Sequence, residues 1–194
     1  MLQLQTTSQG FYEVKGSKFL SFLTPIEEFE STLQTLRVEH PKAVHFVTAT
    51  RTKEVQICES FSDDGEPKGS SGVPTLNVLR GENLINVGAI SVRYFGGTLL
   101  GVGGLVRAYT QAIQEAVKSA KDLGLLLPYE ELIQWEISPS YALLNQVLYL
   151  CEKSKVKILH REFLSSGVKL TLSANGANKE NFEALCESEA ILLC

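Results

Sequence analysis

The stretch LINVGAISVRYFGGTLLGVGGLVRAY, residues 84–109, decides how the fold of this sequence is interpreted. Its first part, residues 84–95, is almost continuously apolar, which is typical of a central β-strand buried on both faces. Its last part opens a helix expected at residues 104–124, because Leu105, Ala108 and Ala112 recur along one side. The stretch therefore predicts a strand, a glycine-rich loop and a helix in succession.

The residues before this stretch add further strands and helices. Short runs of branched and aromatic residues predict strands, and prolines mark the first turns of helices. The expected elements are strands at 18–26, 43–50 and 54–61, a hairpin turn at 51–53, a helix that follows the first strand and ends before Pro41, and a short helix at 73–80. A domain that combines a sheet with helices follows from this pattern.

A second pattern begins after residue 125. Strands are expected at 132–138, 155–164, 167–173 and 190–194, with helices at 140–153 and 178–188. The order βαββαβ is that of a ferredoxin-like domain. We therefore expect an α+β protein of two domains, residues 1–125 and 126–194.

The composition limits the class of protein. The 194 residues include 44% hydrophobic and 21% charged residues, and the formal net charge is −4. This is typical of a soluble globular protein and argues against a generally basic nucleic-acid binder, although a local basic patch is compatible with it. Four cysteines without C-x-x-C spacing favour a reduced compartment over a zinc site or a disulfide framework. With no signal peptide and no apolar run of membrane-spanning length, we expect a cytoplasmic protein.

The glycines of the central stretch could form a phosphate site. Free N–H groups at a helix start favour an anion, and Arg93 and Arg107 could add positive charge. A P-loop is excluded because Val102 stands where lysine is needed, and Val106 excludes a dinucleotide fingerprint. The alternative is that the glycines only pack the helix tightly onto the sheet. These glycines are Gly96, Gly97, Gly101, Gly103 and Gly104.

The acidic stretch SDDGEPKGSSG, residues 62–72, has three interpretations. It could be a turn in which Asp63 and Asp64 accept backbone N–H bonds and Ser70 or Ser71 caps the next helix. It could instead supply a carboxylate pair for acid–base chemistry or for a hard cation. In the third interpretation its carboxylates pair with Arg93 or Arg107 across the sheet, so that the two loops fix each other.

Catalytic chemistry is not visible in the sequence. His45 lies among apolar residues and is more typical of a hydrogen-bonded core histidine than of a base, because no nucleophile accompanies it. No serine stands in a G-x-S-x-G elbow. We therefore predict no catalytic residue, no metal and no cofactor, and consider an enzyme the less favoured class.

The two loop stretches together resemble the signature of the YigZ/IMPACT family. The residues concerned are SDDGEPKGSSGVPTLNVL at 62–79 and VRYFGGTLLGVGGLVRAY at 92–109. The resemblance implies an N-terminal α/β sandwich of the type found in EF-G domain IV and a small-subunit ribosomal protein. It also implies a C-terminal ferredoxin-like domain similar to EF-G domain V. Members of the family are associated with translation control, and the eukaryotic relative binds another protein and restrains a translation-regulating kinase.

We accordingly expect a non-enzymatic regulatory protein that engages the ribosome or structured RNA through these two loops. The alternatives are recognition of a protein partner in translation control without RNA, and a small-molecule enzyme that uses the anion site. The oligomeric state is not indicated. The candidate binding residues are His45, Asp63, Asp64, Glu66, Lys68, Ser70, Arg93, Tyr94, Gly96, Gly97, Gly101, Gly103, Gly104, Arg107 and Tyr109.

Overall fold

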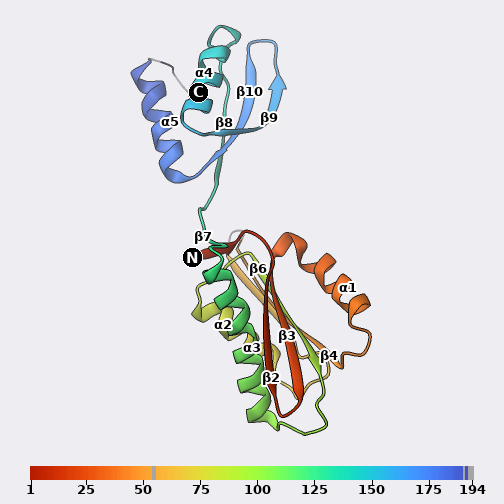
Figure 1. Cartoon of the computed structure of the whole chain (residues 1–194). Coiled ribbons are helices and arrows are strands. Elements are labelled where there is room, and N and C mark those ends of the chain that lie inside the picture. Colours follow the sequence, from red (N-terminus) through yellow and green to blue (C-terminus); the bar gives the residue numbers. More distant parts are fainter. Residues whose placement is uncertain (54–55, 190, 192–194) are drawn as a thin grey trace. The chain divides into compact units, whose positions relative to one another are not determined.

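A computed structural model describes residues 1–53, 56–189 and 191. The chain divides into two compact units, Met1–Tyr129 and Glu130–Cys194, which are described separately (Figure 1). The sequence pattern predicted the domain boundary after residue 125. Residues 126–128 form a strand, β7 (Leu126–Pro128), which pairs with β1 (Leu2–Leu4) and so belongs to the first unit.

An antiparallel sheet forms the centre of the first unit. Its strand order is β2-β3-β6-β4-β5, and β6 lies between β3 and β4. All of β6 except its last residue, Tyr94, is buried, as the continuous apolar run predicts. The strands are β2 (Ser8–Val14), β3 (Ser17–Pro25), β4 (His45–Lys53), β5 (Ile57–Ser62) and β6 (Val87–Tyr94).

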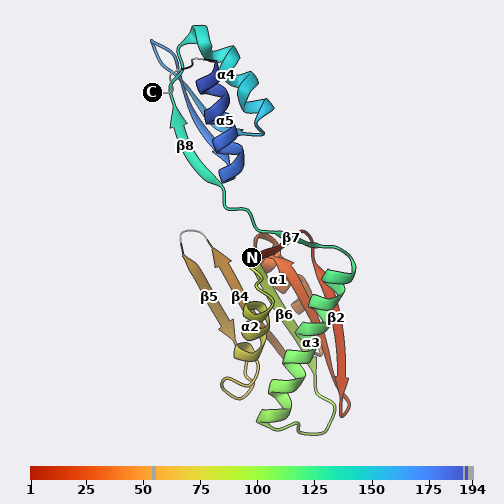
Figure 2. The same ribbon diagram turned by 90° about the vertical axis from the view of Figure 1, so that its left-hand side faces the viewer.

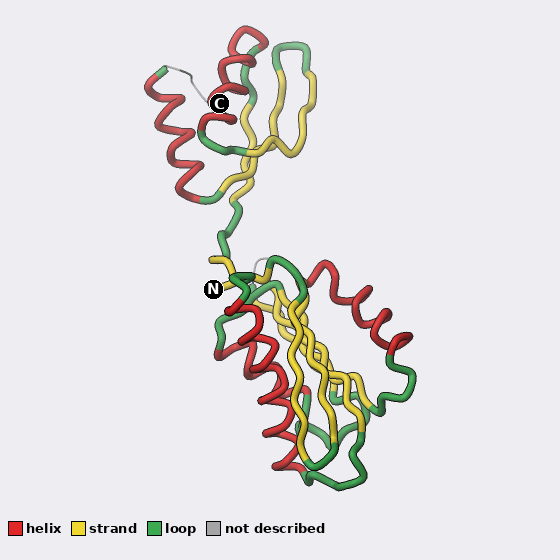
Figure 3. Tube along the Cα trace, viewed as in Figure 1, coloured by secondary structure: helices red, strands yellow, loops and turns green. Residues whose placement is uncertain are grey.

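Helices cover both faces of this sheet (Figures 1 and 2). Helix α1 (Phe29–Glu39), preceded by the 3₁₀ turn Ile26–Glu28, lies on one face. Helices α2 (Gly72–Gly81) and α3 (Val102–Asp122) lie on the other. Figure 3 shows the strands as a layer between these helices. The sheet buries apolar residues toward both layers, which gives the unit a core on each side.

The central sheet of the first unit differs from the sequence prediction in strands β2 and β4, and the short strands β1 and β7 were not predicted either. Residues 51–53 form the last part of β4 and pair with Glu59, Cys58 and Ile57, so they are not the hairpin turn. Strand β2 was not predicted at all. Its inward positions include Ser8 and Gly10, because the backbone of α3 lies directly over them: a Cβ at Gly10 would lie 2.3 Å from the backbone nitrogen of Ala116.

The second unit has a sheet of order β8-β10-β9 with two helices on one face (Figure 2). Phe182, Leu150 and Leu172 are fully buried between the two layers. The elements are β8 (Ile133–Ile137), α4 (Tyr141–Lys153), β9 (Lys157–Phe163), β10 (Val168–Ala174) and α5 (Gly176–Ser188). The last predicted strand, 190–194, lies outside the described residues apart from residue 191.

Candidate functional site

A buried network of charged and polar side chains lies at the end of the sheet where β6 stops and α3 begins, which we call the loop end. Arg93 comes from β6, Glu66 from the acidic loop and Tyr109 from α3. The Arg93 Nη1 group forms an ion pair with Glu66 Oε1, and the Tyr109 hydroxyl donates to the same oxygen at 2.7 Å. The side chains of Arg93 and Glu66 are 6% and 3% exposed. The two loops therefore fix each other through Glu66 and Arg93, as the third interpretation of the acidic stretch describes.

Tyr109 is held as a neutral hydrogen-bond donor in this network. Burial raises the pKa of Tyr109 far above its usual range, and the neighbouring Glu66 carboxylate raises it further. Arg93 also lies over the ring of Phe19, with 5.5 Å between the guanidinium carbon and the ring centroid. Its Nε is buried and has no hydrogen-bond partner in the described part of the chain.

His45 stands opposite Arg93 in the pairing of β4 with β6. Its Nδ1 lies 2.7 Å from the backbone oxygen of Asp64. Because a carbonyl oxygen only accepts, Nδ1 carries the hydrogen and donates it. The other ring nitrogen, Nε2, lies 3.9 Å from Glu66 Oε1. His45 thus links the acidic loop to the sheet from beside the buried network.

Asp63 closes the acidic loop and caps helix α2. Its carboxylate accepts hydrogen bonds from the backbone N–H groups of Gly69 (2.8 Å), Ser71 (3.2 Å) and Gly72 (2.8 Å), and from the Ser71 hydroxyl (2.7 Å). Burial alone would raise the pKa of Asp63, but the hydrogen bonds together outweigh it and the pKa is lowered. The cap of α2 is thus Asp63, since the N-cap residue Ser71 makes no side-chain capping bond.

Replacing Asp63 by alanine is expected to destabilise the first unit by about 1–2 kcal/mol, because the N-terminal N–H groups of α2 lose their acceptor. The folded-state pKa is lower than that of the unfolded chain. The carboxylate's contribution should therefore be complete above the ordinary value of 3.8 and be lost as the pH falls through the lowered folded-state value. Urea unfolding of wild type and Asp63→Ala at neutral and strongly acidic pH measures this.

The exposed residue Glu13 offers a matched control for Asp63. Glu13→Ala also removes a carboxylate, but no side-chain hydrogen bond to an α2 N–H is lost. A stability difference for Asp63→Ala that is equally large at both pH values would contradict the capping role of the ionised carboxylate.

Asp64 joins the acidic loop to β4. Its Oδ2 accepts the backbone N–H of Phe46 at 2.6 Å, and its Oδ1 lies 3.4 Å from Arg37 Nη2. The two adjacent aspartates therefore serve different partners. Their carboxylates are therefore not directed at a common ligand position. In the described residues, no group of three or more His, Cys, Asp or Glu side chains is suited to hold a metal.

The predicted glycines serve different purposes. A Cβ on Gly96 would lie 1.9 Å from the backbone carbonyl carbon of Gly16, so Gly96 lets the β2–β3 turn pack against the loop. Gly97 and Gly101 have positive φ angles of 82° and 69°. The remaining two, Gly103 and Gly104, lie in the first turn of α3, which has no side-chain cap and no acidic residue.

The other candidate residues separate into buried and exposed groups. Ser70 is fully buried, and the half-buried Tyr94 has its hydroxyl 2.8 Å from Nδ1 of His40. Lys68 and Arg107 are exposed. Arg93 and Tyr109, both named as candidate binding residues, are buried beneath the loops, so neither side chain is exposed to meet a ligand in the described fold.

Two adjoining hollows open at the loop end. The apolar hollow has a volume of about 340 Å³ and lies over Glu66 and Arg93, with walls that include Leu99, Val102 and Leu105. The cationic hollow has a volume of about 140 Å³ and contains Lys15 and Arg107. Leu100 lines both hollows.

Sequence reasoning missed the wall residues of the apolar hollow because it concentrated on the glycines between them. The run of apolar residues inside a loop, TLLGV at 98–102, was the signal that could have found them. Its three large apolar members, Leu99, Leu100 and Val102, line the hollow together with Gly101.

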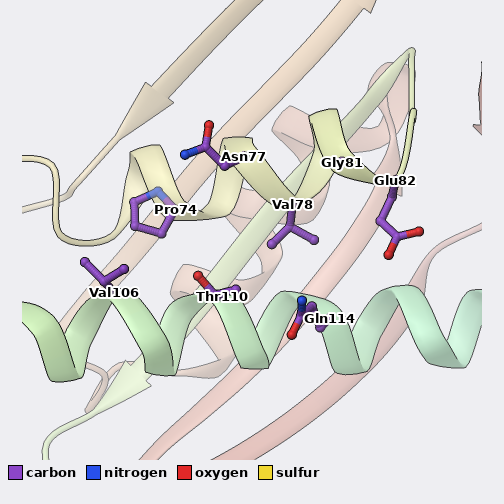
Figure 4. A pocket seen from close by; sticks show the side chains of 8 residues that line it. All are labelled: Pro74, Asn77, Val78, Gly81, Glu82, Val106, Thr110 and Gln114. Atoms are coloured by element: carbon purple, nitrogen blue, oxygen red, sulfur yellow. The ribbon is translucent and has the colours of Figure 1, made fainter.

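A third hollow of about 280 Å³ lies between α2 and α3 (Figure 4). The side chains of Asn77, Thr110 and Gln114 line it, together with Glu82. Glu82 is already engaged by Lys121, whose Nζ lies 2.5 Å from its Oε2. This hollow therefore offers amide and hydroxyl groups but no free pair of charges.

No helix in the described residues is long and apolar enough to span a membrane.

The first unit is defined by a sheet, helices on both faces, and loops fixed by a buried Glu–Arg–Tyr network. Residues 15–117 match the Impact N-terminal domain. A Haemophilus influenzae protein described as an IMPACT family member is 36% identical over 182 residues, which cover 89% of this chain and 84% of that protein. This chain belongs to the IMPACT family.

Two further relatives are similar over different lengths. The Escherichia coli IMPACT family member YigZ is 38% identical over 113 residues, 55% of this chain and 54% of that protein. A crystal structure of a hypothetical protein matches with a TM-score of 0.77 and 28% identity, covering 100% of this chain and 94% of that one.

Proposed function

We propose that this protein is a non-enzymatic binding protein that acts in the regulation of translation. Family membership supports the link to translation control. The observation that supports a binding role is that the carboxylates of Glu66 and Asp63 at the loop end are already engaged by groups of the protein itself. Glu66 is bound by Arg93 and Tyr109, and Asp63 is bound by the start of α2. A surface of exposed side chains above these paired groups suits recognition better than catalysis.

The contact with the translation machinery is proposed to run through the loop end. For RNA or the ribosome, the supporting residues are Lys68 and Arg107, whose exposed charges could meet phosphates. For a protein partner, the support is the apolar hollow beside them. Arg93, which the sequence suggested as a phosphate contact, is left out because it is buried.

We also propose that the first unit resembles domain IV of EF-G and that the second unit resembles domain V. The strand order β8-β10-β9 supports this for the second unit. In a ferredoxin-like domain the third strand lies between the first and the second, and β10 stands in that position. The α4 and α5 crossovers also have their expected places in the chain order.

Co-sedimentation with ribosomes at low and physiological salt tests the proposed function. Wild type is expected to sediment with ribosomes more strongly at low salt. The Lys68→Ala/Arg107→Ala variant is expected to bind several-fold more weakly and to show a shallower salt dependence, because about one counterion contact is lost per charge.

The matched control is Lys118→Ala/Lys157→Ala, which removes two exposed charges, one from the last part of α3 and one from β9 of the second unit. Equal losses in the two variants would reveal a response to total charge only. If wild type does not sediment at either salt, the proposed contact with the ribosome is refuted.

A further inference from the structure

Four large apolar side chains around the apolar hollow are exposed to solvent. Leu99 is 83% exposed, Val102 57%, Val44 53% and Phe95 47%. All four line the same hollow, although they come from the residue before β4, the glycine-rich loop and the first turn of α3. Single exposed apolar residues are ordinary on a protein surface, but a cluster around one hollow is typical of an interaction site.

The floor of this hollow favours an apolar occupant. Its charged residues, Glu66 and Arg93, form an ion pair with each other, and Tyr109 also donates to Glu66. A buried charge that is already paired is not left uncompensated when an apolar group covers it. Because the Glu66–Arg93 pair carries no net charge, it does not attract a charged occupant. A volume of about 340 Å³ accommodates a bulky side chain.

The neighbouring cationic hollow favours an anionic group. Lys15 and Arg107 both line it, and neither forms an ion pair within the part of the chain that the structure describes. The first turn of α3 lies beside them without an acidic residue or a side-chain cap. Its N–H groups add a positive field on the same side. Because Leu100 lines both hollows, one ligand could fill them together.

We propose that the two hollows bind an acidic segment of a partner protein, with one bulky apolar side chain in the apolar hollow and a neighbouring carboxylate on Lys15 and Arg107. This inference rests on the proposed function and specifies the partner's chemistry. RNA fits less well. A base gains its binding energy by stacking on flat side chains and pairing its edge. The walls of the apolar hollow are largely aliphatic, with Phe95 and His45 as their aromatic members, and the Glu66 and Arg93 charges are already paired.

Methyl NMR of the full chain, labelled at leucine and valine, tests the inference. The probes are the blocked peptide Glu-Asp-Glu-Leu-Asp-Glu-Asp and the same peptide with alanine in place of leucine. We expect the leucine peptide to shift the methyl signals of Leu99, Leu100 and Val102, and the alanine peptide to bind roughly tenfold more weakly.

Variants separate the two hollows. Leu99→Ser should weaken the leucine peptide but leave the alanine peptide unchanged, whereas Lys15→Ala/Arg107→Ala should weaken both. Val38→Ser is the matched control, since Val38 is 80% exposed on α1 and lines neither hollow. All these positions are exposed, so the variants are expected to fold.

Two results would overturn the inference: no shift of these methyl signals at millimolar peptide, or larger shifts with an oligouridylate than with the peptide. The ribosome assay distinguishes failure of this inference from failure of the proposed function. Salt-dependent ribosome binding without any response to the peptide refutes the acidic-segment inference alone. Specific peptide binding without ribosome binding refutes the ribosome contact alone.

Discussion

Replacing Arg93 by methionine is expected to destabilise the first unit by about 3–5 kcal/mol. The change leaves the Glu66 carboxylate buried and without its cation, which is the costly way to disrupt a buried ion pair. Tyr109 would still donate one hydrogen bond to Glu66, but a neutral donor cannot replace a full positive charge. Chemical denaturation followed by far-ultraviolet circular dichroism measures the loss.

Two comparisons make this test specific. The double variant Glu66→Leu/Arg93→Met removes both charges and should recover most of the lost stability, because no uncompensated charge remains. The fluorescence of Trp135, the single tryptophan, reports on the second unit and should change its transition little if the units unfold independently. If Arg93→Met alone unfolded like wild type, the ion pair would not be a main support of the loop end.

Alanine at position 96 is expected to cost about 3 kcal/mol, near the upper end for overpacking. The added Cβ would lie 1.9 Å from the carbonyl carbon of Gly16 and 2.1 Å from the nitrogen of Ser17. Both are backbone atoms, so no side-chain rotation can relieve the contact. The β2–β3 turn would have to move away from the loop, and the hydrogen bond from the Gly96 N–H to Ser17 Oγ, now 3.1 Å, would lengthen.

Neighbouring glycines provide graded controls for Gly96→Ala. Gly97→Ala meets no atom within 4 Å but keeps a positive φ of 82°, so a cost of about 1 kcal/mol is expected. Gly103→Ala lies in α3 with Arg107 Nη1 3.7 Å away and is expected to be neutral or stabilising by up to about 1 kcal/mol. The order of the three thermal midpoints checks the series. Equal midpoints would show that backbone packing at residue 96 is not limiting.

The elements with strong periodic patterns could be predicted from the sequence. Strand β6 and helix α3 were found because the strand is buried up to its last residue and the helix has a continuous inward-facing row of apolar residues. Strand β2 could not be found in this way. Ser8 and Gly10, which face α3, are small, whereas Phe11 faces solvent and is 54% exposed. The close approach of the α3 backbone therefore reverses the pattern on which prediction depends.

The candidate site was predictable in its members but not in its pairing. The sequence supplied Glu66, Arg93 and Tyr109 as members, and it offered a carboxylate–arginine pair as one of three interpretations. Which arginine pairs with the carboxylate depends on how β6 is aligned with β4. Arg93 reaches Glu66 because β6 ends beside the first residue of β4, His45, whereas Arg107 lies on the exposed side of α3. Such placement is a property of the tertiary structure and not of local sequence.

The pairing of β1 with β7 has a consequence for the order in which the chain folds as it is synthesised. Leu2 lies opposite Pro128, and the backbone N–H of Tyr129 donates to the carbonyl oxygen of Met1. Residues 2–4 thus receive β7 as their partner strand only after residues up to 128 have emerged from the ribosome. Contacts between such distant positions form late, because their loop-closure cost is high. During synthesis, Leu2 can first form its two backbone hydrogen bonds with residues 83 and 85, so the closure of β1 on β7 should be the last step of the first unit's assembly.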